Sequence, residues 1–174
     1  MILTDSNGRQ STSDSIKNHM PLADRGACDI DIVVAYTLDE AIQRVDRGAI
    51  QVKDSVTIID NLTNDIRGTK LRSSITPERL VEAIGQLKGS LKKAGVRDTV
   101  ICEVKPMMMK NVDPYNRRLS GYLRGQSLGL GYPTQIRLKH LKRDGFHVRY
   151  AFQGIIDQTY AGAIKMALTP IDGC

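Results

Sequence analysis

The feature that most constrains the fold of this 174-residue chain is an alternation of short apolar runs with amphipathic segments. The runs are rich in β-branched residues, which favour strands, and the segments between them repeat their apolar residues at helical spacing. Four runs stand out, at 2–4, 30–35, 56–60 and 99–104, and a weaker fifth covers 134–138. The three central runs are almost continuously apolar, as expected of strands covered on both faces. The pattern predicts βαβ units, and therefore an α/β fold with a five-stranded parallel sheet.

Helix signals separate these runs. Thr37 and Glu40 match a capping box, an apolar stripe follows, and Gly48 is a typical stop residue. Proline at 77 is suited to the first turn of another helix, because its missing N–H has no intrahelical partner there. The helices predicted in this way cover 13–20, 37–48, 76–95, 113–123 and 153–166. No repeat or low-complexity segment interrupts them, so we expect one α/β domain over residues 1–174.

Composition narrows the class of protein. A hydrophobic content of 41% and a charged content of 25% are typical of a globular domain, and no apolar run approaches the roughly 20 residues of a membrane helix. Met1 leads directly into the first predicted strand, without the features of a signal peptide. We therefore expect an intracellular protein, or a domain cut from a longer polypeptide.

Cysteine and histidine positions favour no metal site. Cys28, Cys102 and Cys174 are odd in number and form no paired framework, which fits a reducing compartment. Cys102 lies inside an apolar run, so it is interpreted as a small buried hydrophobe. The three histidines are scattered, with no zinc-ligand spacing, and we predict neither a metal nor an organic cofactor.

Polar residues follow the predicted strands at one edge of the sheet. Ser6 comes just after the first strand and Asn64 just after the third, where open α/β sheets bind their ligands. Near the chain end, Asp144 and His147 are three residues apart, so the acid can orient the imidazole on one tight loop. Together they form a nucleophile, base and acid in the chain order Ser, Asp, His.

These residues predict acyl transfer. His147 would take the proton of the Ser6 hydroxyl while Asp144 holds the other ring nitrogen, and the Ser6 N–H and the Asn64 side-chain amide would face the oxyanion. Each segment taken alone is also an ordinary turn sequence. Their order, and their placement at one sheet edge, favour the catalytic interpretation.

The chain resembles the SGNH (GDSL-type) hydrolase superfamily. Thr4-Asp5-Ser6 is similar to its first motif and Leu62-Thr63-Asn64-Asp65 to its third, each with the glycine replaced, and residues 144–147 match its DxxH motif in full. The resemblance implies a three-layer α/β/α flavodoxin-like fold and a serine esterase or acyl-hydrolase acting on a small ester without a cofactor. It also implies Ala35, in place of the second-motif glycine, as a further oxyanion amide.

The net charge of +6 supports a second interpretation. Basic residues cluster late in the chain, and such clusters favour phosphate backbones. The candidate nucleic-acid contacts are Arg137, Lys139, Lys142 and Arg143. The alternative function is therefore a catalytically weak SGNH-like domain that binds RNA or DNA, and a basic cluster is also compatible with a simply solvated face.

Overall fold

The computed structural model describes residues 1–52, 55–68, 73–125 and 132–168. Its sheet has four parallel strands in the order β2-β1-β3-β4. The strands are β1 (Ile2–Thr4), β2 (Ile32–Val34), β3 (Val56–Asp60) and β4 (Asp98–Ile101). From β1 the chain moves outward to β2 and then crosses to the other side of β1 to form β3. This order makes the carboxyl ends of β1 and β3 the switch point, where α/β sheets form ligand crevices.

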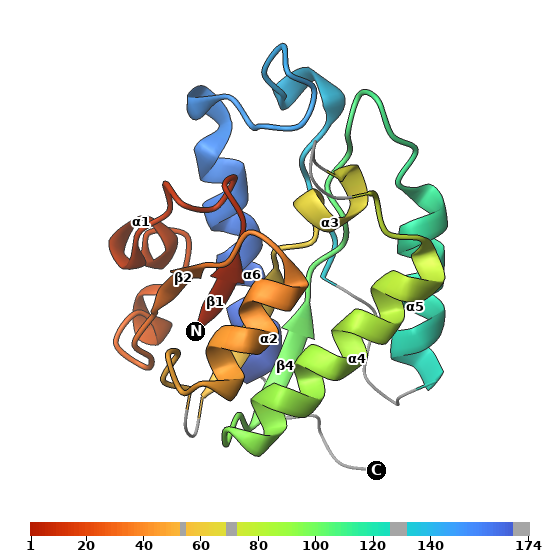
Figure 1. Ribbon diagram of the computed structural model, residues 1–174. Helices are drawn as coiled ribbons and strands as arrows, with labels where there is room; N and C mark the ends of the chain where they lie inside the picture. The colour runs from red at the N-terminus through yellow and green to blue at the C-terminus, as the bar shows by residue number, and fades with distance from the viewer. Residues whose placement is uncertain (53–54, 69–72, 126–131, 169–174) are drawn as a thin grey trace.

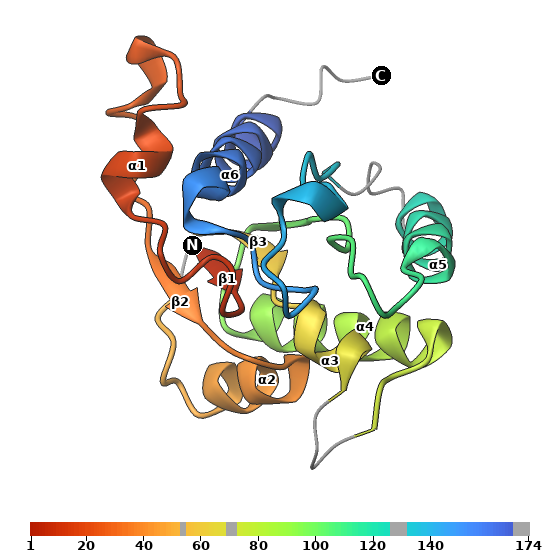
Figure 2. The same ribbon diagram turned by 90° about the horizontal axis from the view of Figure 1, so that it is seen from above.

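Helices cover both faces of the sheet (Figures 1 and 2). On one face lie α2 (Leu38–Asp46) and α4 (Pro77–Lys93), with α5 (Asp113–Gly125) packed beside α4. On the other face lie α1 (Ser13–Lys17) and α6 (Gln153–Leu168). The remaining elements are short: α3 (Thr63–Arg67), η1 (Leu22–Asp24), η2 (Leu138–His140) and η3 (Tyr150–Phe152). The predicted three-layer α/β/α arrangement is therefore confirmed, as is Cys102 as a buried residue.

Two apolar cores form because successive side chains of a strand point to opposite faces. In β1, Ile2 faces α6 whereas Leu3 faces α2 and α4. The same alternation holds in the neighbouring strands. Ile58 and Val100 join Ile2 in the core beside α6, and Ile59 and Ile101 join Leu3 in the core beside α2 and α4. All six side chains are at most 5% exposed, which explains why these runs are almost continuously apolar in sequence.

The start of α2 differs in one detail from the predicted capping box. The Thr37 hydroxyl accepts the Glu40 N–H at 3.2 Å, as expected. The Glu40 carboxylate, however, accepts the N–H of Tyr36 at 2.9 Å, one residue before the cap. Asp65, in α3, accepts the Leu38 N–H at 2.9 Å and so joins the start of α2 to the segment after β3.

The prediction of a fifth strand at 134–138 is wrong. Tyr132 pairs with β4 through two backbone bonds, donating to Ile101 at 2.8 Å and accepting from Glu103 at 2.9 Å. The next N–H on this side, that of Thr134, donates to the Glu103 carboxylate at 3.3 Å instead of to a backbone carbonyl, and the chain remains irregular until η2. The first predicted helix is also shorter than expected, ending at Lys17. Within the described residues, none of the helices has the length and apolar character needed to cross a membrane.

Candidate active site

Ser6 and His147 meet at the carboxyl edge of the sheet. Ser6 lies two residues beyond β1, and its Oγ is 2.9 Å from Nε2 of His147, which is 141 residues later in the chain. The other ring nitrogen of His147, Nδ1, is 2.8 Å from Oδ2 of Asp144. The His147 side chain is 32% exposed and that of Asp144 is 39% exposed, so a small molecule can approach this hydrogen-bonded chain from solvent.

Asp144 is held by its own loop. Its Oδ1 accepts the N–H groups of Phe146 at 3.1 Å and of His147 at 3.0 Å, which leaves Oδ2 for the imidazole. Gly145 between them has a φ of 80°, a conformation that side-chain-bearing residues rarely adopt. Burial alone would raise the pKa of Asp144, but the hydrogen bonds from His147 and Phe146 outweigh it and hold the pKa below its ordinary value.

Asn7 joins the loop of His147 to the turn of Ser6. Its side-chain Oδ1 accepts the N–H of Val148 at 2.9 Å, and its Nδ2 donates to the carbonyl of Phe146 at 3.3 Å. The backbone groups on either side of His147 are therefore bound by the residue next to Ser6. Asn7 is only 4% exposed, so these bonds are protected from water. Sequence reasoning missed this role, and the only signal for it was a polar residue directly after the predicted serine.

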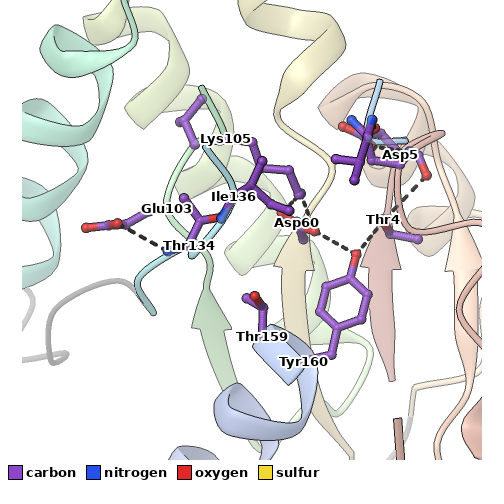
Figure 3. Close-up of polar contacts among 12 residues, drawn as sticks. Thr4, Asp5, Asp60, Glu103, Lys105, Thr134, Ile136, Thr159 and Tyr160 are labelled. Atoms are coloured by element: carbon purple, nitrogen blue, oxygen red, sulfur yellow. Dashed lines mark hydrogen bonds and ion pairs between the residues drawn. The ribbon is translucent and has the colours of Figure 1, made fainter. Parts of the chain in front are cut away.

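A buried polar network lies below the Ser6 turn (Figure 3). Lys105, after β4, donates to both carboxylate oxygens of Asp60 at the end of β3, each at 2.5 Å. Tyr160 rises from α6, and its hydroxyl is 2.6 Å from Asp60 Oδ2 and 2.7 Å from the Thr4 hydroxyl. All four residues are at most 4% exposed. The network therefore connects the ends of β1 and β3 to the segment after β4 and to α6.

Lys105 and Asp60 form an ion pair within the network. Burial alone would lower the pKa of Lys105, but the charges of Asp60 and Asp5 outweigh it and raise the pKa, so Lys105 is a cation at neutral pH. Burial and the Asp60 charge raise the pKa of Tyr160 well above its ordinary value, so its single proton is donated to Asp60. The Thr4 hydroxyl must then be the donor to Tyr160. A Cβ at Gly8 would overlap the hydroxyls of both Thr4 and Tyr160, so the Ser6 turn rests directly on this network.

Comparison with known proteins gives matches among solved structures only. No protein-family profile and no curated protein sequence matches the chain. The structure of TesA superposes with a TM-score of 0.67 at 14% identity, covering 96% of this chain and 98% of TesA. A carbohydrate esterase family 3 enzyme from Talaromyces cellulolyticus superposes equally well, at 15% identity and with 97% and 94% coverage. A GDSL-like lipase from Bacteroides thetaiotaomicron has a TM-score of 0.61, 12% identity and coverages of 96% and 87%.

The chain has the SGNH (GDSL-type) hydrolase fold. At 12–15% identity the likeness establishes the fold alone, so what the SGNH fold does in this chain has to be argued from its own residues.

Two other predicted residues of the SGNH motifs lie at the same edge but differ in availability. Asn64 is in the first turn of α3, and its Nδ2 donates one hydrogen to the Tyr36 carbonyl at 3.0 Å. The second hydrogen of this amide is not used in that bond. The Ala35 N–H donates to the Thr4 carbonyl at 2.9 Å, as a continuation of the β1–β2 ladder. In this arrangement Ala35 cannot also donate to an oxyanion, and the expectation for it was wrong because the residue extends the sheet.

The four predicted nucleic-acid contacts, Arg137, Lys139, Lys142 and Arg143, are all exposed. The Arg137 guanidinium is used locally, donating to the carbonyls of Thr134 and Ile136 at 3.2 Å each. Lys142 instead lines a pocket beside Ser6 and His147. The structures that share the SGNH fold are described as esterases and lipases, so they do not support nucleic-acid binding. The described part of the chain has no group of three or more metal-ligating side chains.

Proposed function

We propose that this protein is a serine hydrolase that cleaves a small or exposed ester through an acyl-enzyme on Ser6. The observation that carries the proposal is the continuous chain of hydrogen bonds from Ser6 Oγ to His147 Nε2 and from His147 Nδ1 to Asp144 Oδ2, at 2.9 and 2.8 Å. A hydroxyl, an imidazole and a carboxylate in this relation are sufficient for general-base activation of serine. Two structures of the same fold are described as a carbohydrate esterase and a lipase, which supports the reaction class.

In the first step, Ser6 Oγ attacks the ester carbonyl while its proton moves to His147 Nε2. The Asp144 carboxylate stabilises the imidazolium that forms. His147 then donates this proton to the departing alkoxide as the ester C–O bond breaks, which leaves the acyl group on Ser6. Water then attacks the carbonyl of the acyl-enzyme and gives a proton to His147. His147 returns this proton to Ser6 Oγ as the bond between Ser6 and the acyl group breaks, which releases the acid.

The oxyanion needs donors at the same edge of the sheet. The backbone N–H of Ser6 has no hydrogen-bond partner among the described residues, and it lies on the nucleophile's own turn. The second N–H of the Asn64 amide is the other proposed donor. Each donor of this kind contributes about 10²–10³ in rate.

Reaction with a neutral fluorophosphonate, followed by intact mass, tests the proposal. The wild type should gain one adduct, and Ser6→Ala should gain none. Ser73→Ala removes an exposed hydroxyl away from the triad and should be labelled like the wild type. Loss of Ser6 should also lower ester hydrolysis by at least about 10⁴-fold. A folded wild type that gains no adduct, or Ser6→Ala with full esterase activity, would exclude the mechanism.

A further inference from the structure

We propose that the substrate ester carries a carboxylate or phosphate group, which binds between Arg9 and Lys142 beside Ser6. The inference rests on the proposed hydrolase function and names the substrate class. A pocket of about 260 Å³ opens next to Ser6 and His147, and nine residues line it. Arg9 and Lys142 are both among them, Val148 is the one aliphatic residue, and no acidic residue belongs to the lining. Such a lining suits a small, polar, negatively charged group better than a long acyl chain.

The backbone that carries Arg9 is fixed. Arg9 lies in a turn closed by a hydrogen bond from the Ser11 N–H to the Gly8 carbonyl, at 3.0 Å. The Ser11 hydroxyl donates to Asp157 at 2.5 Å and accepts from Gln153 at 3.0 Å, and both partners belong to α6. The guanidinium therefore extends from an anchored turn that begins two residues after Ser6.

The backbone that carries Lys142 is also fixed. Its N–H donates to the His147 carbonyl at 2.7 Å, and its carbonyl accepts the Gly145 N–H at 3.0 Å. Leu141 and Val148 also form an antiparallel bridge. The ammonium group of Lys142 is thus carried by the same small loop that positions His147.

Neither cation is neutralised by the residues that the structure describes. Within the described part of the chain, no ion pair involves Arg9 or Lys142. The segments that line the pocket contain three carboxylates: Asp5 and Asp157 are buried, and Asp144 is bound to His147. Two unpaired cations beside a nucleophile attract an anionic substrate and favour its correct orientation.

Matched ester pairs test the proposal. With the charge on the alcohol side, para-acetoxybenzoate is compared with the neutral para-acetoxybenzamide. The ester para-acetoxyphenyl phosphate, compared with the same neutral amide, tests whether the anionic group is a phosphate. With the charge on the acyl side, the mono-para-nitrophenyl ester of adipic acid is compared with its methyl ester. At least one charged ester should exceed its neutral partner in kcat/KM by about five- to ten-fold at low salt. The ratio should fall as ionic strength rises.

The variant Arg9→Gln/Lys142→Gln should bring this ratio close to one while leaving the fluorophosphonate adduct on Ser6 intact. Arg117→Gln/Arg118→Gln removes the same charge from the exposed side of α5 and should keep the preference. Equal rates on charged and neutral esters, with Ser6 labelled, would overturn this inference alone. An unlabelled Ser6 would overturn the proposed function and the inference together. If the pocket variant keeps the ester preference and instead loses salt-sensitive binding of single-stranded RNA, the two cations serve nucleic acid and the inference is wrong.

Discussion

The Asn7 side chain accepts the backbone N–H of Val148 at 2.9 Å, although 141 residues separate them in sequence. The same amide donates to the Phe146 carbonyl, so one side chain next to Ser6 holds the backbone on both sides of His147. Asn116 makes an equivalent pair of bonds to the backbone of Val104, at 2.8 and 3.2 Å, away from the triad. The chain therefore contains a natural control for the role of Asn7.

Replacing Asn7 tests whether this clamp positions His147. Asn7→Ala leaves a buried N–H and carbonyl unpaired and should lower the free energy of unfolding by about 1–3 kcal/mol. It should also slow fluorophosphonate labelling of Ser6, because His147 is no longer held against the hydroxyl. Asn116→Ala should cost similar stability and leave the labelling rate unchanged. Equal labelling rates in both variants would show that Asn7 is structural only.

Gly8 allows the Ser6 turn to lie against the Thr4 and Tyr160 hydroxyls. Gly8→Ala places a methyl group into both and should cost about 1–3 kcal/mol of stability through overpacking, while displacing Ser6. Gly121→Ala in α5 is the matched control, because a Cβ there meets no atom within 4 Å. That variant should gain about 0.5–1 kcal/mol from helix propensity and keep the labelling rate. Denaturant unfolding and adduct formation measure both effects, and normal labelling of Gly8→Ala would contradict the prediction.

Breaking the ion pair between Lys105 and Asp60 should lower the free energy of unfolding. Lys105→Met leaves the Asp60 carboxylate buried without its cation and should cost about 3–5 kcal/mol. Adding Asp60→Asn removes the uncompensated charge and should recover part of this loss. A double variant less stable than Lys105→Met would refute this account.

The same pair predicts a dependence on alkaline pH. The folded pKa of Lys105 is raised, so its contribution is fully present below the unfolded value of about 10.4 and is lost as pH rises through the folded value. The difference in stability between wild type and the double variant Lys105→Met/Asp60→Asn, which has neither titrating group, should therefore stay constant from neutral pH upward and narrow only above about pH 10.4. Urea unfolding at a series of pH values measures it.

The lowered pKa of Asp144 predicts that stability also depends on pH in the acidic range. Its folded pKa is lowered, so its contribution is present above the unfolded value of about 3.9 and is lost as pH falls through the lower folded value. NMR titration of the Asp144 carboxyl carbon should give a midpoint below about 3.9. In His147→Gln the midpoint should rise toward the ordinary value, because the imidazole bond is lost. A wild-type midpoint at or above the ordinary value would disprove the arrangement.

The apolar runs of the sequence predicted four strands correctly and a fifth wrongly. The runs at 2–4 and 56–60 match β1 and β3 residue for residue, because buried parallel strands require continuous apolar sequence. The run at 134–138 looked similar, but the Thr134 N–H donates to the Glu103 carboxylate, so the backbone pairing ends at Tyr132. Ala35 was misjudged for a related reason, since its N–H continues the β1–β2 pairing.

By itself, the sequence predicted that Ser6 follows the first strand, that Asn64 follows the third, and that Asp144 and His147 share one tight loop. These facts depend on residues near one another in the chain. Only the tertiary structure decided that His147 reaches Ser6 and that Asn7 holds the loop in place. It also decided that Lys105 and Tyr160 meet at Asp60, from 45 and 100 residues away. Such contacts depend on strand order and helix packing, which bring distant residues together at one sheet edge and leave no periodic signal in the sequence.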